Sequence, residues 1–544
     1  MLGLMQQQPL LISSLLMHAA RHHANAEVVS ATGQGTTQHS TWATTESRAR
    51  QLVRVLQGLG VQAQDRVGTL AWNDCRHLEI YYATSGMQAI CHTINPRLAP
   101  DDIAYIIGHA GDSVLFVDPG FAALIGGIAS KIKDSVRAIV MMTDAAGMPV
   151  LDLPGGMRLL CYDDLMDAAD DDYAWPTFDE NTASALCYTS GTTGRPKGVL
   201  YSHRSTVIHA YAVALPDVLS LRTTSRILPV VPMFHVNAWG IPYATALTGA
   251  ALVLPGRHLD GASLARLLNQ EHVTMTCGVP TVWLGLLQHL RASGEKLATV
   301  TRIMTGGSAA PPLLIEAFRD EFGVTVEHGW GMTELSPVGT YNAPKPGLSG
   351  DEAVRHMLKQ GHVLAGIDMK IVDGDGHELP WDGKQFGDLM VRGPWVCSGY
   401  YGEAPGSACD ADGWFATGDV ATIDPDGTME ITDRSKDVIK SGGEWISSIT
   451  LENIAVSHPD VAEAAVVAAL HSKWDERPLL LVVARPGHTV DPASVLRMYQ
   501  GQVPKWWLPD AVLVVPELPH TATGKLLKTA LRTRYRDHYR QATT

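Results

Sequence analysis

Long apolar runs are absent from the 544-residue sequence. No stretch reaches the roughly 18 consecutive apolar residues that a transmembrane helix needs, so we expect no membrane span. Residues 1–23 also make a poor signal peptide, because no basic residues precede the short apolar part and no small-residue cleavage site follows it. A packed amphipathic helix fits this stretch better, and peripheral contact with a membrane stays open.

Cysteine is scarce and scattered. The seven cysteines are Cys75, Cys91, Cys161, Cys187, Cys277, Cys397 and Cys409. Their odd number and the lack of any CxxC or Cys/His cluster argue against a disulfide framework and against a zinc site. Reduced thiols in a cytoplasmic protein are the expectation.

An excess of positive charge is also missing. The chain carries 42 Lys and Arg against 56 Asp and Glu, a formal net charge of -14. A nucleic-acid-binding protein needs a basic face to displace counterions, so we expect no nucleic-acid partner. Anionic small molecules are still acceptable ligands, because backbone N–H groups and a few Lys or Arg can build a local phosphate site.

The pattern along the first 340 residues alternates between two kinds of segment. Short β-branched runs such as 66–72, 113–118 and 136–142 are separated by helical patterns such as 44–59 and 101–109. This alternation predicts α/β architecture with buried, mainly parallel sheets. The Gly- and Pro-rich stretch after residue 342 predicts a loop or a poorly ordered connection.

The remainder of the chain shows two further sequence patterns. Short strands with DG turn signals predict a small antiparallel β subdomain at about 345–434. From residue 435 to 544 two helical and three strand patterns predict a compact α+β domain. We therefore place a domain boundary in the segment 433–437, between a large N-terminal domain (1–434) and a small C-terminal domain (435–544).

The strongest chemical signal is CYTSGTTGRPKGVLYSH at 187–203. An apolar strand runs into a hydroxyl- and glycine-rich loop that offers side-chain oxygens and unhindered N–H groups to a polyphosphate. The loop and its lysine are Thr189, Ser190, Gly191, Thr192, Thr193, Gly194 and Lys197. The pattern is not the GxxxxGK[ST] of P-loop NTPases, and a flexible surface loop explains it poorly.

TSGTTGxPKG resembles the signature of the adenylate-forming superfamily, and further motifs of that family follow in order to residue 528. The sequence is most similar to bacterial medium- and long-chain fatty acid–CoA ligases and to methylmercaptopropionate–CoA ligases. The resemblance implies a ligase that uses ATP, Mg²⁺ and CoA. It also implies that residues 1–434 bind the nucleotide, while residues 435–544 form a mobile lid carrying the catalytic lysine.

Two further motifs, 302–311 and GWGMTE at 329–334, are implied to hold the nucleotide. Trp330 is expected to stack on adenine, Thr333 to contact the α-phosphate, and Glu334 to bind Mg²⁺ together with Thr189. The other ATP or AMP contacts that the resemblance implies here are Gly307, Ser308, Ala309, Gly329, Gly331 and Met332.

The C-terminal motifs complete the implied site. Asp419 is assigned to the ribose hydroxyls, Arg434 to ribose or phosphate, and Lys436 to the interdomain hinge. Lys525 is the catalytic lysine that would bridge the attacking carboxylate and the α-phosphate when the lid closes. The segment that would form the CoA channel is Ser441, Gly442, Gly443, Glu444 and Trp445.

The choice of acid depends on VPMFHVNAWG at 231–240. Amino-acid-activating relatives have an Asp where this chain has His235, so an amino-acid substrate is disfavoured. The resemblance places His235 beside the carboxylate path as a catalytic residue, makes Trp239 the gate of the acyl pocket, and lines that pocket with Gly306 and Gly329. Core packing explains Trp239 equally well. For His235 the alternative is a histidine of the core whose hydrogen bonds are all satisfied.

Several alternatives stay open. Medium-chain acids come first and long-chain acids next, with the short thioether acid 3-methylmercaptopropionate as the runner-up. An acyl-AMP ligase that loads a carrier protein is disfavoured because no insertion is visible, and a catalytically dead nucleotide-binding protein is disfavoured because its key residues are present.

The segment GHVLAG (361–366) departs from the family pattern, with no loss of activity expected. A homodimer is left open, since relatives are often dimers.

Overall fold

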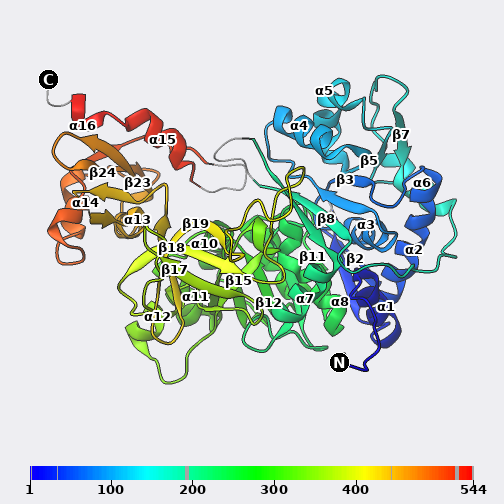
Figure 1. Cartoon of the computed structure of the whole chain (residues 1–544), viewed down its shortest axis with the longest axis horizontal. Coiled ribbons are helices and arrows are strands. Elements are labelled where there is room, and N and C mark those ends of the chain that lie inside the picture. The colour runs from blue at the N-terminus through cyan, green and yellow to red at the C-terminus, as the bar shows by residue number, and fades with distance from the viewer. Residues whose placement is uncertain (2, 33–34, 190–194, 443, 521–525, 542–544) are drawn as a thin grey trace. The chain divides into compact units, whose positions relative to one another are not determined.

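The computed structural model describes residues 1–544 except 2, 33–34, 190–194, 443, 521–525 and 542–544 (Figure 1). The described chain divides into two compact units. Unit 1 contains Met1–Thr189, Pro196–Asp368 and Arg392–Phe415, and unit 2 contains Met369–Val391 and Ala416–Thr544. The predicted boundary at 433–437 lies within unit 2, and the division into residues 1–434 and 435–544 stays a prediction.

The first sheet of unit 1 has the strand order β7-β6-β5-β3-β4-β8-β9 over the described residues (Figure 1). Its strands are β3 (Arg66–Leu70), β4 (Ile90–Thr93), β5 (Asp112–Val117), β6 (Ala138–Met141), β7 (Arg158–Cys161), β8 (Ala183–Tyr188) and β9 (Gly198–Ser202). All neighbours are parallel except β8 and β9. The apolar runs predicted as strands are buried ladders, as expected for a sheet covered by helices.

The second sheet of unit 1 has the order β16-β15-β14-β13-β12-β10-β11-β1-β2. Its strands are β1 (Glu27–Ala31), β2 (Thr37–Thr41), β10 (Arg226–Pro229), β11 (Ala251–Leu254), β12 (Met275–Gly278), β13 (Arg302–Thr305), β14 (Thr325–Gly331), β15 (Val338–Asn342) and β16 (His362–Val363). The centre is parallel, and β2, β15 and β16 pair antiparallel. The prediction of α/β sheets is confirmed.

Helices cover both sheets. They are α1 (Ile12–His22), α2 (Trp42–Gly58), α3 (Cys75–Gly86), α4 (Pro100–Ala110), α5 (Ala122–Ile132), α6 (Tyr162–Asp167), α7 (His203–Ala214), α8 (Ile241–Thr248), α9 (Gly261–Gln270), α10 (Pro280–Ser293), α11 (Pro312–Phe322) and α12 (Gly350–Leu358). One core joins α4 and α5 to the first sheet, and another joins α9, α10 and α11 to the second. Short 3-10 turns are η1 (Pro119–Phe121), η2 (Ala145–Gly147), η3 (Val236–Gly240) and η4 (Thr333–Leu335).

Helix α12 corrects a prediction, because its residues lie in the stretch expected to be a loop or a poorly ordered connection. Acidic Asp351 and Glu352 occupy its first turn and basic Arg355 its last, which suits the helix dipole. Its two buried residues, Val354 and Met357, lie three apart on one face. This pattern is too short to stand out against the glycines and prolines around it.

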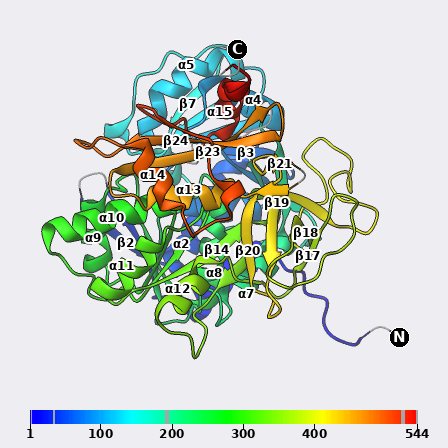
Figure 2. The ribbon, with the colours of Figure 1, turned by 90° about the vertical axis from the view of Figure 1, so that its left-hand side faces the viewer.

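The N-terminal helix α1 is amphipathic, as predicted. Ile12, Leu15, Leu16 and Ala19 are buried, and α1 contacts α2, α3, α7 and α8. Figure 2 shows that the N-terminal segment before α1 is drawn as coil. None of the helices in the described part of the chain combines the length and the apolarity that a bilayer span requires.

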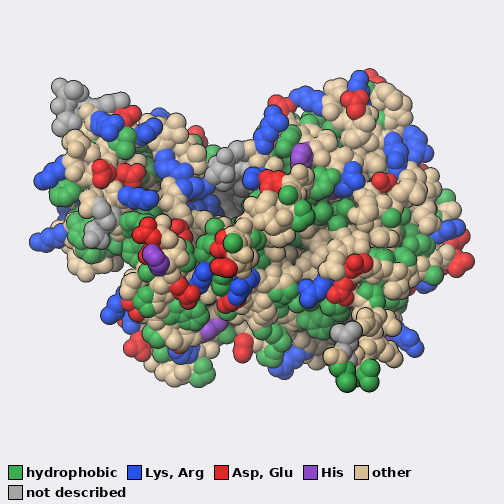
Figure 3. All heavy atoms as spheres, viewed as in Figure 1, with side chains coloured by type: hydrophobic (Ala, Val, Ile, Leu, Met, Phe, Trp, Pro, Cys, Tyr) green, Lys and Arg blue, Asp and Glu red, His purple; other side chains and the backbone are tan. Residues whose placement is uncertain are grey.

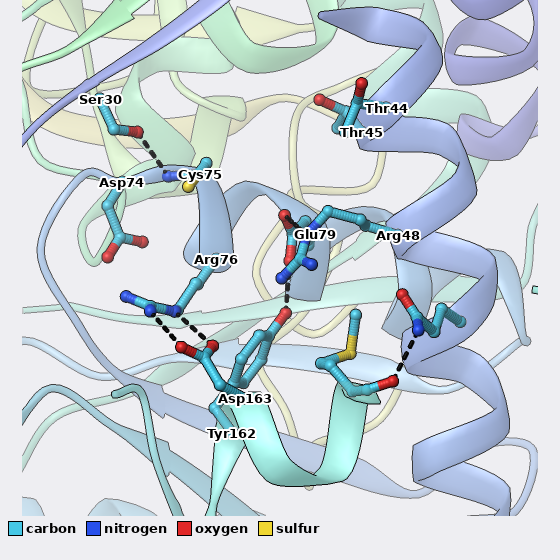
Figure 4. Close-up of polar contacts among 12 residues, drawn as sticks. Ser30, Thr44, Thr45, Arg48, Asp74, Cys75, Arg76, Glu79, Tyr162 and Asp163 are labelled. Carbon is cyan, nitrogen blue, oxygen red and sulfur yellow. Dashed lines mark hydrogen bonds and ion pairs between the residues drawn. The ribbon is translucent and has the colours of Figure 1, made fainter. Parts of the chain in front are cut away.

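A buried polar network fastens three helices of unit 1 together (Figure 4). The Glu79 carboxylate on α3 accepts hydrogen bonds from Nε of Arg48 on α2, at 2.6 Å, and from the hydroxyl of Tyr162 on α6, also at 2.6 Å. Arg76 binds Asp163 through two nitrogens, at 3.2 and 2.8 Å. Because Glu79 is almost inaccessible to solvent, its charge is tolerated only with these partners.

Unit 2 contains two sheets. The first, in the order β17-β18-β19-β20, is the predicted β subdomain, and the second has the order β22-β21-β24-β23 with β25 beside β24. The strands are β17 (Asp368–Val372), β18 (Phe386–Arg392), β19 (Phe415–Ile423), β20 (Met429–Arg434), β21 (Ile439–Ser441), β22 (Glu444–Ile446), β23 (Val461–His471), β24 (Asp475–Ala484) and β25 (Ala511–Val514).

Helices lie on both faces of the second sheet of unit 2 (Figure 2). They are α13 (Ser448–Val456), α14 (Pro492–Met498), α15 (Lys528–Tyr535) and α16 (His538–Gln541), with the 3-10 turn η5 (Lys505–Trp507). One core packs α13 and α14 against β23 and β24, and a second packs Leu531 of α15 against the opposite face. Figure 3 shows several Lys and Arg side chains on the visible face of these C-terminal elements.

Candidate active site

The ends of the glycine-rich loop are held together by the β8–β9 hairpin. Tyr188 and Gly198 are its last paired residues. Beyond them the N–H of Thr189 donates to the carbonyl of Lys197 at 2.9 Å, and the N–H of Lys197 donates to the Thr189 hydroxyl at 3.2 Å. The predicted residues Ser190, Gly191, Thr192, Thr193 and Gly194 lie outside the described residues. The described stem therefore fixes where the loop begins and ends.

The ammonium group of Lys197 contacts two side chains from the segment before β19. Its ammonium lies 3.6 Å from the carboxylate of Glu403 and 4.4 Å from the ring centroid of Tyr400. A cation over an aromatic face is attracted by the ring quadrupole. The same Tyr400 donates its hydroxyl hydrogen to Oε1 of Glu334 at 2.9 Å. Tyr400 thus connects the lysine of the loop to the predicted metal ligand.

Thr333 and Glu334 form the short turn η4 after β14, and both are buried. The carbonyl of Thr333 accepts a hydrogen bond from the Tyr201 hydroxyl at 2.6 Å, and the carbonyl of Glu334 accepts one from the N–H of Cys397 at 2.8 Å. Glu334 and Thr189 offer hard oxygen donors, which is the donor chemistry that Mg²⁺ prefers. These residues therefore fit the metal that the family implies.

The end of β14 places the residues predicted to hold adenine. A bulge between Trp330 and Gly331 interrupts the pairing with β15. A Cβ on Gly331 would lie 2.1 Å from the carbonyl oxygen of Pro337, so only glycine fits there. The N–H of Met332 donates to the same carbonyl at 3.0 Å. The indole of Trp330 lies against Gly339, where a Cβ would be 2.6 Å from Cζ3.

The loop Gly307, Ser308 and Ala309 follows β13 and is positioned by a buried histidine. His328 on β14 lies with Nε2 3.3 Å from the Ser308 carbonyl oxygen and Nδ1 3.0 Å from that of Leu358. Burial lowers the pKa of His328. Sequence reasoning missed this residue, because a single histidine before GWGMTE carries no motif of its own.

Three of the predicted acyl-pocket residues lie next to one another. A Cβ on Gly306 would lie 2.8 Å from the carbonyl oxygen of Gly329 and 3.2 Å from Cη2 of Trp239. The indole of Trp239 therefore packs directly over Gly306. The missing side chain at residue 306 is what allows this close approach.

The segment after His235 has an unusual backbone. Residues 236–240, which form η3, all have positive φ, from 43° at Val236 to 76° at Gly240. Left-handed conformations are costly for residues other than glycine, and such strain is typical of functional sites. Buried Asn237 helps to hold the turn, because its Oδ1 lies 3.3 Å from the Tyr81 hydroxyl and 3.4 Å from the Cys187 thiol. Sequence reasoning did not anticipate this turn.

Unit 2 brings together the two residues predicted to bind ribose. Asp419 on β19 and Arg434 on β20 are directly opposite in the antiparallel register, and Nε of Arg434 lies 3.6 Å from Oδ1 of Asp419. Lys436 follows at once, and its pKa is lowered by burial and by the neighbouring charges of Arg434 and Arg532. A carboxylate paired with a guanidinium is well suited to receive ribose hydroxyls.

The predicted CoA channel begins at the turn between β21 and β22. The Ser441 hydroxyl accepts from Arg477 at 3.2 Å, and Gly442, with φ of 60°, donates its N–H to the Trp474 carbonyl at 2.9 Å. Trp445 packs beside Phe386 at 5.7 Å between ring centroids. Gly443, the predicted catalytic residue Lys525 and the side chain of Glu444 lie outside what the structure describes.

Comparison with known proteins agrees with this geometry. Residues 16–401 match the model of the AMP-binding enzyme family, and residues 450–525 match that of the AMP-binding enzyme C-terminal domain. The chain belongs to the AMP-binding enzyme family.

Two relatives are similar over nearly all of both chains. A 3-methylmercaptopropionyl-CoA ligase of Ruegeria lacuscaerulensis is 51% identical over 99% of this chain and 99% of its own. A medium-chain-fatty-acid–CoA ligase of Ectopseudomonas oleovorans is also 51% identical, over 99% and 98%. Among solved structures, the anthranilate CoA ligase AuaEII in complex with anthranoyl-AMP has a TM-score of 0.86 at 24% identity, covering 97% of this chain and 98% of its own, which shows the fold.

Proposed function

We propose that the protein is an AMP-forming fatty acid–CoA ligase that prefers medium-chain acids. The observation that carries this proposal is the chain of contacts from Lys197 through Tyr400 to Glu334 beside the stem of the glycine-rich loop. A cation and a carboxylate connected in this way would suit an ATP polyphosphate and its metal. Family membership and two full-length relatives that are CoA ligases support the reaction class.

The first half-reaction joins acid and nucleotide. A carboxylate oxygen of the acid attacks the α-phosphorus of ATP, and pyrophosphate leaves to give acyl-AMP. Bound Mg²⁺ would neutralise phosphate charge, with Thr189 and Glu334 as its ligands from the protein. Thr333 would contact the α-phosphate, and Trp330, Asp419 and Arg434 would hold the nucleoside.

The second half-reaction transfers the acyl group to CoA. The CoA sulfur attacks the acyl carbonyl, the thiol proton is released, and AMP leaves with the bonding electrons of the acyl–oxygen bond. We propose that residues 435–544 rotate about Lys436, so that Lys525 serves the first step and 441–445 serve the second.

A second substrate is favoured by one observation. The Ruegeria ligase for 3-methylmercaptopropionate is as similar to this chain as the medium-chain ligase is. The packing of Trp239 on Gly306 gives no acyl length by itself. The short thioether acid is therefore kept as the second candidate, and the cytoplasmic location and a homodimer stay predictions.

The test measures pyrophosphate release and acyl-CoA formation with ATP, Mg²⁺ and CoA across a panel of acids. The panel runs from acetate to C18 acids and includes 3-methylmercaptopropionate and several amino acids. We expect acyl-CoA with a maximum at C6–C12. A maximum at the thioether acid would select the second candidate. Pyrophosphate release without acyl-CoA would indicate a different thiol acceptor, and no turnover with any acid would contradict the proposal.

A further inference from the structure

Tyr400 makes two contacts that neither the sequence motifs nor the family comparison assign to it. Its hydroxyl donates to Oε1 of Glu334 at 2.9 Å, and its ring supports the ammonium of Lys197 at 4.4 Å from the centroid. Glu334 belongs to the turn after β14 and Lys197 to the stem of the glycine-rich loop. One side chain therefore touches two residues that are 137 positions apart in sequence.

The backbone around Tyr400 is fastened at both of these places. The N–H of Cys397 donates to the carbonyl of Glu334, and the N–H of Tyr401 donates to the carbonyl of Gly198, each at 2.8 Å. A Cβ on Gly198 would lie 3.1 Å from Cβ of Tyr401, so the two segments are in close contact. The position of Tyr400 is thus set by backbone bonds on either side of it, as expected for a residue that orients others.

The chemistry of the phenol suits this role. A phenol is ordinarily protonated in the neutral range, so its hydroxyl is available as a donor to the carboxylate. A hydrogen bond to one carboxylate oxygen favours the orientations of the carboxylate that keep this bond. Groups that orient metal ligands in this way commonly change metal affinity when they are removed.

We propose that Tyr400 is a positioning residue that orients Glu334 toward the divalent cation and holds Lys197 toward the nucleotide phosphates. This inference rests on the proposed function, because it assumes that the cation and ATP bind here. Tyr400 touches neither ligand in the proposal, and it acts through its two neighbours. Glu403 forms an ion pair with the same ammonium, at 3.6 Å.

Three variants separate the two contacts. Tyr400→Phe removes the hydroxyl and keeps the ring, and Tyr400→Leu removes both. The matched control is Tyr401→Phe, which removes a neighbouring hydroxyl that donates to the Ala110 carbonyl at 3.4 Å. Mn²⁺ is the spectroscopic probe, and its binding in the presence of a non-hydrolysable ATP analogue is measured by electron paramagnetic resonance. Binding of the metal-free analogue is measured separately by calorimetry.

We expect Tyr400→Phe to weaken Mn²⁺ binding about 10-fold and to leave the affinity for the metal-free analogue unchanged. Tyr400→Leu should weaken Mn²⁺ binding equally and should also weaken the metal-free analogue about 3-fold, because the cation–π support of Lys197 is lost. Tyr401→Phe should match the wild type in both measurements. The KM for the acid should not change in any variant.

Wild-type Mn²⁺ affinity in Tyr400→Phe would overturn the inference, as would an equal loss in Tyr401→Phe. Failure of the proposed function is recognised separately. In that case the wild-type protein forms no AMP with any acid, while the binding measurements still report on Tyr400.

Discussion

At the scale of single residues, Gly306 is the position where the smallest change has a clear expected effect. Adding a methyl group in Gly306→Ala would place Cβ 2.8 Å from a backbone oxygen and 3.2 Å from the Trp239 indole. The indole or the backbone must shift, so we expect kcat/KM to fall about 10-fold for C10 and longer acids and less for acetate. Initial rates across the acid panel measure this difference.

The control for Gly306→Ala is Gly285→Ala on α10, where an added Cβ meets no atom within 4 Å. It should leave the acid profile unchanged and raise stability slightly, because alanine is the better helix former. An unchanged acid profile in Gly306→Ala would show that residues 306 and 239 do not line the acyl pocket.

Lys525 is predicted from its motif alone, and its role separates the two half-reactions. In Lys525→Ala we expect acyl-AMP formation to fall at least about 100-fold, because the charge that stabilises the transferring phosphate is lost. Thioester formation from synthetic acyl-AMP should fall much less. Pyrophosphate release and CoA consumption are followed separately, with Lys384→Ala, an exposed lysine of unit 2, as the control. Equal loss of both half-reactions would contradict the division of roles.

At the scale of elements, sequence patterns predicted the regular parts well and the irregular parts poorly. Buried parallel strands read as continuous apolar runs, so β3, β5 and β6 were expected within two residues of their ends. Helix α12 was missed because only Val354 and Met357 mark its buried face. The left-handed turn η3 was missed because Val236 has a β-branched side chain that disfavours positive φ, and its conformation is imposed by tertiary contacts.

The backbone conformation of the turn η3 predicts which of two substitutions at Asn237, by glycine or by alanine, gives the more stable protein. Residue 237 has a φ of 53°, which asparagine tolerates and glycine adopts freely, whereas alanine does not. Asn237→Gly and Asn237→Ala both lose the contacts with Tyr81 and Cys187. The glycine variant should nevertheless be the more stable by about 1 kcal/mol, the reverse of the order found in right-handed helices. Urea unfolding of both variants measures this, and an alanine variant of equal or higher stability would show that the turn is not left-handed.

At the scale of the whole molecule, several residues predicted from motifs lie together, whereas the residues that contact and orient them were not predicted. Predicted residues Gly306, Gly329 and Trp239 lie together, and Asp419 faces Arg434. Tyr400 and His328 could not be predicted, because their roles depend on contacts between segments distant in sequence. SGYYGEAP reads only as a turn, and nothing local indicates that its first tyrosine reaches Glu334.

Buried histidines make unit 1 sensitive to acid. Burial lowers the pKa of His77 and His203 to about 4 and of His209 to about 3, while unfolding returns them to their ordinary value near 6.5. At pH values between the pKa of the folded state and that of the unfolded state, the unfolded chain binds more protons than the folded chain. The free energy of unfolding therefore decreases as the pH falls below about 6.5. Asp74 opposes this in part, because burial raises its pKa to about 7 and folding then favours its protonated form.

His209 allows this acid sensitivity to be measured at one site. Its Nε2 accepts a hydrogen bond from the N–H of Val338 at 3.1 Å, and a glutamine carbonyl in His209→Gln can replace that acceptor without taking up a proton. For the wild type, this single group should reduce the free energy of unfolding by about 2 kcal/mol from pH 7 to pH 5. In His209→Gln that part of the pH dependence should disappear, as measured by urea unfolding at both pH values. His258→Gln, at an exposed position, should keep the wild-type slope. A wild-type slope in His209→Gln would mean that His209 is not buried in its neutral form.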